Sequence, residues 1–153
     1  MSEIKLVRIY DHEQPTGYRM LVDRMWPRGM SKIKAALDEW DKQIGPTNEL
    51  RKWFNHEDEK FPEFKAKYIE ELDKNEFTSE FIETVKKQLI KNDVLFLYGA
   101  KNRKHNQAVV LKEYVQEKLK QMKKLIAVDK LFYLDMFTSM AFDAPEVKQN
   151  SQN

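Results

Sequence analysis

The order of hydrophobic and polar positions along the chain predicts a small sheet. Ile4–Tyr10 alternates between its two faces, as a strand with one buried face does, and Tyr18–Met25 has a similar strand-forming composition. Asp93–Tyr98 is the most apolar segment and shows no helical period, which is typical of a central strand buried on both faces. We therefore expect these three segments to be strands, with Asp93–Tyr98 as the central one.

Helical spacing of apolar residues accounts for most of the remaining chain. Ser31 is a suitable N-cap for a helix that extends to about Gln43, and Gly45 followed by Pro46 ends it. Further helices are expected at Asn48–Asn55, at Asp58–Lys74, from Thr78 onwards and at His105–Lys123. Leu125–Phe142 is apolar with scattered charges, and we interpret it as a strand followed by a helix.

This order of elements predicts a single three-layer α/β domain, in which helices flank a small, mostly parallel sheet. We assign residues 1–124 to this domain and residues 125–153 to a C-terminal extension that packs on it, with a frayed polar end at 144–153. Ligands bind beyond the carboxyl ends of strands in such sheets. A site is therefore expected where the loop after Tyr10 meets the segments Asp23–Gly29 and Gly99–His105.

Composition excludes several classes of protein. The chain has no cysteine, which rules out disulfides, a thiolate nucleophile and a thiolate metal site. Its longest nearly uncharged apolar stretch, Val94–Ala100, is too short to span a bilayer, and the N-terminus lacks an apolar signal core. We therefore expect a cytoplasmic protein that does not associate with membranes.

The charge is distributed unevenly, although the formal net charge is only +2. Arg19–Lys34 carries five basic residues and one acid, whereas Glu57–Glu76 carries eight acids and four lysines. A net charge this small does not by itself predict binding to nucleic acid. Its distribution predicts a polarised surface with one basic region.

The first candidate site is the segment Val22–Gly29, in which one carboxylate and two guanidinium groups follow a strand. The arginine forks of Arg24 and Arg28 suit phosphate or carboxylate and stay charged at any physiological pH. Asp23 could orient an arginine, or act as a base if its pKa were raised. Trp26 could stack on a planar ligand or close the core. The structural alternative is an Asp–Arg pair that holds the turn.

The second candidate site is Tyr98–Asn106, where a buried strand leads through a glycine turn and three cations into the start of a helix. Free backbone N–H groups at a helix start favour an anion, and Lys101 is a suitable charge for phosphate. His105 could act as an acid or base. The alternative is a solvated basic loop in which Asn106 or its neighbour Asn102 caps the helix. Neither a phosphate loop of the Walker type nor a dinucleotide motif is present.

A third candidate is His56, which follows an aromatic pair at the end of a short predicted helix. It could transfer protons, or it could satisfy backbone carbonyls as helix-end histidines commonly do. The three histidines of the chain have no metal-binding spacing, and no serine lies in a nucleophile-elbow motif. We therefore expect neither a metal nor a cofactor.

Long motifs of this chain are similar to those of a known family. They are Arg19–Gly29, Asp38-x-Trp40, Gly45–Thr47, Leu50–His56 and Leu97–Asn106. In this order they resemble the YeaO-like branch of the domain-of-unknown-function family 488, over roughly residues 4–120. The resemblance implies a three-layer α/β fold and no established activity. It places signature positions on Asp23, Arg24, Trp26, Arg28, Trp53, His56, Lys101, His105 and Asn106.

The leading functional hypothesis is an enzyme that hydrolyses, or transfers a group from, an anionic small substrate, either phosphate-bearing or nucleotide-like. In it, proton transfer falls to Asp23, His56 or His105, and ligand binding to Arg24, Trp26, Arg28, Lys101 and Asn106. The alternative is a non-catalytic module that binds nucleic acid or an anionic metabolite. A third hypothesis is a protein-interaction domain that uses Leu125–Phe142. No pattern in the sequence specifies an oligomeric state.

Overall fold

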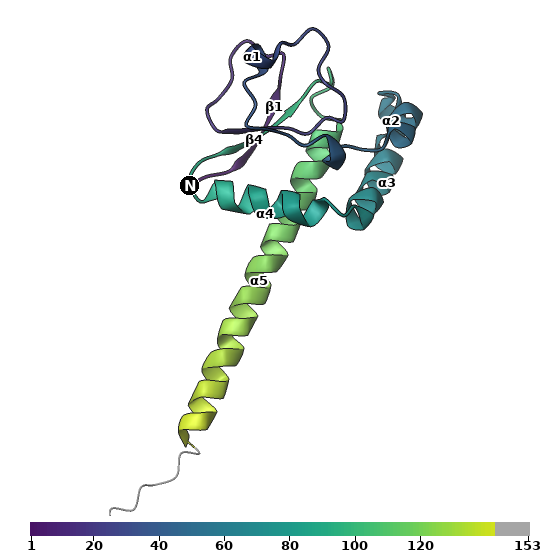
Figure 1. Ribbon diagram of the computed structural model, residues 1–153. Coiled ribbons are helices and arrows are strands. Elements are labelled where there is room, and N and C mark those ends of the chain that lie inside the picture. The colour runs from purple at the N-terminus through teal and green to yellow at the C-terminus, as the bar shows by residue number, and fades with distance from the viewer. Residues whose placement is uncertain (143–153) are drawn as a thin grey trace, which may run out of the picture. The chain divides into compact units, whose positions relative to one another are not determined.

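The computed structural model describes residues 1–142 and divides the chain into two compact units, Met1–Leu119 and Lys120–Asn153, each of which we describe by itself (Figure 1). The strands are β1 (Ile4–Arg8), β2 (Tyr18–Leu21), β3 (Glu39–Trp40) and β4 (Val94–Tyr98). The α-helices are α1 (Lys32–Ala35), α2 (Asn48–Phe54), α3 (Phe61–Lys74), α4 (Thr78–Leu89) and α5 (Gln107–Phe142). Short 3-10 turns cover Lys42–Ile44 and Asp58–Lys60.

The sheet has four strands in the order β1-β4-β2-β3, and every pairing is parallel. All five residues of β4 are buried, because strands flank it on both sides and side chains cover both of its faces. Leu95 and Leu97 belong to a core cluster with Met30 and Ala35, whereas the Phe96 ring packs 5.5 Å from that of Phe81 in α4. The predicted α/β class, with Asp93–Tyr98 as the central strand, is confirmed.

The segment after Ser31 differs from its prediction. Ser31 does cap a helix, accepting a hydrogen bond from the Lys34 N–H at 3.1 Å, but α1 ends at Ala35 and Ala36 is left-handed, with φ at 46°. Glu39–Trp40 then pairs with β2 as strand β3. The expected helix to Gln43 is therefore wrong beyond Ala35, because the free edge of β2 supplies hydrogen bonds that override helical propensity.

The neighbouring elements follow the sequence more closely. Thr47 caps α2 by accepting from the Leu50 N–H at 3.2 Å, and α3 and α4 occupy the positions expected from their apolar spacing. Strand β2 ends at Leu21 rather than at Met25, so Asp23 and Arg24 lie beyond the strand. That early end places both side chains at the edge of the sheet where β1 and β4 also end.

The second unit is helical over residues 120–142, as the continuation of α5. The strand expected at the start of Leu125–Phe142 is therefore wrong; the segment contains neither glycine nor proline to interrupt a helix. No helix among residues 1–142 has the length and apolarity that crossing a membrane requires. The frayed end expected at 144–153 lies outside the described residues, and the packing of the extension on the domain stays a prediction.

Candidate functional site

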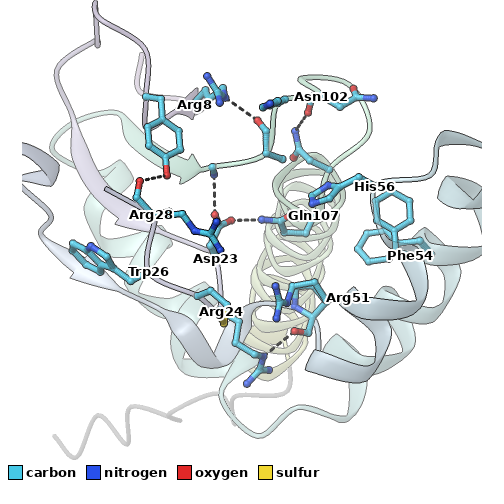
Figure 2. Close-up of a pocket in the computed structure, with 18 residues that line it drawn as sticks. Arg8, Asp23, Arg24, Trp26, Arg28, Arg51, Phe54, His56, Asn102 and Gln107 are labelled. Atoms are coloured by element: carbon cyan, nitrogen blue, oxygen red, sulfur yellow. Dashed lines mark hydrogen bonds between the residues drawn. The ribbon is translucent and has the colours of Figure 1, made fainter. Parts of the chain in front are cut away.

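A cavity of about 870 Å³ opens at the carboxyl ends of β1, β2 and β4 (Figure 2). We call it the strand-end pocket. It is lined by side chains from the loops after these strands, from the end of α2 and from the start of α5: Arg8, Tyr10, Asp23, Arg24, Met25, Trp26, Arg28, Pro46, Arg51, Phe54, His56, Phe64, Gly99, Ala100, Lys101, Asn102, Asn106 and Gln107. The location agrees with the rule for parallel sheets.

The strand-end pocket is strongly basic. Its lining contains five cationic side chains and a single carboxylate, Asp23; the cations are Arg8, Arg24, Arg28, Arg51 and Lys101. Among residues 1–142, none of these five forms an ion pair. Like charges gathered around a cavity raise its positive potential and oppose folding, and an anionic ligand removes both effects.

Two of the arginines have part of their guanidinium group engaged with the backbone. Arg24 donates from Nε to the Pro46 carbonyl at 2.8 Å and from Nη2 to the Gly45 carbonyl at 2.9 Å. Arg8 donates from Nε to the Ala100 carbonyl at 3.0 Å. Arg24 therefore holds the loop before α2 in place, and the Asp–Arg pair considered as the structural alternative does not form between Asp23 and Arg24.

Other cationic groups remain available. The side chains of Arg28 and Lys101 are exposed and have no hydrogen-bond or ion-pair partner among residues 1–142. Arg51 donates from Nη2 to Asn48 at 3.3 Å, but its Nε is buried and lacks a partner among the described residues. A buried donor without an acceptor costs about 1–3 kcal/mol, so Arg51, which lines the pocket, carries an unsatisfied part of its guanidinium group in the pocket wall.

Asp23 lies at the centre of the pocket in Figure 2, where Gln107 and the Gly99 backbone donate to it. The Gly99 N–H lies 2.8 Å from Asp23 Oδ2, and a Cβ at Gly99 would lie only 3.2 Å from the same oxygen. Burial raises the pKa of Asp23 to about 6, while these two hydrogen bonds and the charge of Arg51 act in the opposite direction. Its carboxyl group can therefore change protonation state near neutral pH.

The end of α2 contributes a second wall of the pocket. Phe54 is buried there, and the helix ends in two consecutive left-handed residues, Asn55 at φ 46° and His56 at φ 56°. This turn directs the exposed His56 ring toward the cavity, 6.3 Å from the ring of Phe54 (Figure 2). No hydrogen bond or ion pair joins the His56 side chain to any residue in 1–142.

The structure brings together seven of the eight side chains proposed from the sequence. Asp23, Arg24, Trp26, Arg28, His56, Lys101 and Asn106 line the strand-end pocket. His105 does not: its Nδ1 lies 3.0 Å from Asp58 Oδ1, and its ring stacks on Phe61 at 4.6 Å. His105 therefore belongs to the contact between the basic loop and the start of α3. Functional roles for all eight residues stay predictions.

Two of these lining residues have an evident structural role. The Trp26 indole donates to the Met30 carbonyl at 2.7 Å and packs against the core cluster, so it closes the core beside the pocket. Asn106 is buried and caps α5, accepting from the Val109 N–H at 3.1 Å and donating to the Asn102 carbonyl at 2.8 Å. Both positions fix the pocket wall.

Three lining residues, Arg8, Arg51 and Gln107, were not anticipated from the sequence. Arg8 alternates with apolar residues in a strand, Gln107 lies within a helix, and Arg51, although it falls inside the Leu50–His56 motif, was given no role there. Only the tertiary arrangement brings them to one cavity. Among the described residues, no group of three or more histidine, aspartate or glutamate side chains could hold a metal ion.

The chain is similar to a known family and to several uncharacterised proteins. A family described as "Inactive DUF488-N3 subclade" matches residues 3–130. "Uncharacterized protein YeaO" of Escherichia coli (strain K12) is 43% identical over 114 residues, which cover 74% of this chain and 96% of that protein. "Uncharacterized protein Rv3073c" of Mycobacterium tuberculosis (strain ATCC 25618 / H37Rv) is 40% identical over 72 residues, 46% of this chain and 61% of that protein. No solved structure matches the chain.

Proposed function

This chain belongs to the inactive DUF488-N3 subclade of domain-of-unknown-function family 488, and from that premise we propose that it binds an anionic, phosphate-bearing small molecule without transforming it. The observation that carries the proposal is the set of five cationic side chains around the strand-end pocket, none of them in an ion pair within residues 1–142. Oxygen atoms of a phosphate or carboxylate are the partners that such guanidinium and ammonium groups favour. The description "Inactive" favours binding over turnover.

The direct test is the affinity of the full chain for ribose 5-phosphate, measured by isothermal titration calorimetry. Arg28→Ala removes an exposed, unpartnered guanidinium from the pocket and is expected to weaken binding about tenfold or more, since a hydrogen bond to a charged group contributes about 1.5–3 kcal/mol. Lys86→Ala removes one exposed charge from α4, away from the pocket lining, and serves as the matched control.

Equal effects of the two substitutions would show that only the overall charge matters, and would contradict the proposal. The dependence on salt separates a small ligand from nucleic acid. A polymer that neutralises several phosphates loses affinity steeply as salt rises. One ligand bound among a few pocket cations is expected to saturate at one molecule per chain and to show a shallower slope.

A second candidate function is hydrolysis or group transfer at the same site, without a redox cofactor. It is favoured by Asp23, whose carboxyl faces the pocket and whose pKa burial raises to about 6, a value suited to accepting a proton near neutral pH. A screen of phosphate esters for turnover, with Asp23→Asn as the comparison, separates the two functions. Catalysis requires turnover that the substitution abolishes while binding persists; binding alone requires no turnover in either protein.

A further inference from the structure

We propose that the ligand is a nucleoside monophosphate, whose base lies against a wall formed by Phe54 and His56 while its phosphate lies among Arg28, Arg51 and Lys101. This inference rests on the proposed function and adds a substrate class to it. It follows from the end of α2, where Arg51, Phe54 and His56 all line the strand-end pocket within six residues of chain.

The backbone at His56 is held in a conformation that costs free energy. A left-handed residue other than glycine is disfavoured, although asparagine, aspartate and histidine adopt that region more often than other residues do. Asn55 at φ 46° is an ordinary end for a helix, but His56 at φ 56° continues the left-handed turn. Strained residues of this kind gather at ligand-binding sites, where the surrounding structure maintains them.

A backbone hydrogen bond from the Glu57 N–H to the Phe54 carbonyl at 3.0 Å closes this turn over Asn55 and His56, and the His56 side chain itself adds few contacts. The His56 side chain is exposed, and its single ring contact is an edge-on approach to Phe54, 6.3 Å between ring centroids at 61°. It makes no hydrogen bond or ion pair with residues 1–142. The turn directs the imidazole ring of His56 into the strand-end pocket. The buried ring of Phe54 and the guanidinium group of Arg51, whose Nε has no partner among the described residues, belong to the same lining.

The chemistry of the lining matches the parts of a nucleotide. The cations suit a phosphate, and the aromatic wall suits a planar base, because stacking on an aromatic side chain is favourable for every base. Between them, Gln107 uses its Nε2 to donate to Asp23, which leaves Gln107 Oε1 to accept from a sugar hydroxyl. A cavity of about 870 Å³ is far larger than a bare phosphate needs and lies within the range of small-molecule sites.

The test compares nucleoside 5′-monophosphates with ribose 5-phosphate, which carries the same phosphate and sugar but no base, by calorimetric titration of the full chain. His56→Gly removes the ring and is expected to weaken nucleotide binding about tenfold, from the loss of stacking, while changing the affinity for ribose 5-phosphate less than about twofold. Asn55→Gly is the matched control, because it relieves the neighbouring left-handed residue and Asn55 does not line the pocket.

Both glycine variants are expected to melt a few degrees higher, by about 2–4 °C, because glycine adopts positive φ without strain. This shift shows that the variants fold and that any loss of affinity comes from the site. Ribose 5-phosphate binding as tightly as the nucleotides, or His56→Gly weakening both ligands equally, overturns the nucleotide assignment and leaves anion binding intact. Failure of every phosphate ligand to bind overturns the proposed function as well.

Discussion

Arg51→Met is expected to weaken phosphate binding strongly and, in the absence of ligand, to make the protein more stable. The Arg51 Nε is a buried donor without a partner among residues 1–142, and its charge lies in a pocket with four other cations. Methionine keeps the aliphatic length of the side chain and removes both unfavourable features. We expect the free energy of unfolding to rise by about 1–2 kcal/mol and the affinity for ribose 5-phosphate to fall about 100-fold or more.

The stability of Arg51→Met should be measured by urea denaturation at pH 5. At higher pH the charge of Arg51 also stabilises ionised Asp23, since that charge lowers the Asp23 pKa, and this attraction would partly offset the gain. Arg51→Lys is the matched control, because it keeps the charge and loses the planar fork. A fall in stability for Arg51→Met at pH 5 would mean that Arg51 is a structural residue, and would contradict its assignment as a ligand contact.

The stability of the protein is expected to fall as pH rises through the range in which Asp23 ionises. Burial raises the pKa of this carboxyl from 3.8 to about 6, so between these values the folded protein binds more protons than the unfolded chain. Stability contributed by the neutral carboxyl is therefore present at low pH and is lost as pH rises from about 4 to above 6. The difference between the two pKa values corresponds to about 3 kcal/mol. Asp41, whose pKa burial and Glu39 raise to about 7, acts in the same direction.

Asp23→Asn isolates the contribution of Asp23 from that of Asp41. The variant is expected to exceed the wild type in free energy of unfolding by about 2–3 kcal/mol at pH 8 and to match it near pH 4. The introduced amide can still accept from Gly99 through its oxygen, and Gln107 can turn its own amide so that Oε1 accepts from the introduced NH₂ group. Urea denaturation at several pH values measures the difference. An advantage that does not change with pH would show that Asp23 is neutral throughout, or not buried.

The same group predicts how anion affinity depends on pH. Ionised Asp23 repels an anion in the strand-end pocket, so affinity is expected to increase as pH falls through about 6 and the carboxyl becomes neutral. Sulfate is the suitable probe, because its own charge does not change in this range. The dependence should become weaker in Asp23→Asn.

Local patterns predicted three of the four strands and the location of the pocket, because each of these has a short-range signature. The apolar run of β4, the Thr47 cap and the glycine after β4 each have a local signature, and the rule for parallel strands then located the pocket. The features that failed depend on tertiary contacts. Residues 39–40 form β3 because the edge of β2 is available to them, and His105 lies outside the pocket because Asp58 and Phe61 hold it.

Arg51 illustrates why part of the site was invisible in the sequence. It stands in the middle of α2, where an arginine is typical of a solvated helix face, and the Leu50–His56 motif that contains it drew attention to Trp53 and His56 instead. Its role becomes apparent only when the buried Nε and the cavity are seen together. By contrast, Arg28 follows a strand in a tryptophan–proline turn, a setting that already suggested ligand binding.

Binding of an anion in the strand-end pocket can be followed at Arg51 Nε itself. In a nitrogen–proton correlation NMR spectrum, the Arg51 Nε–Hε signal can be assigned by its absence from Arg51→Met and followed during titration with ribose 5-phosphate. We predict a saturable shift at one ligand per chain, accompanied by shifts of the Gly99 and Lys101 amides and unaffected by equal concentrations of chloride. A signal that does not move, or that moves equally with chloride, would contradict the proposal that the pocket binds an anion.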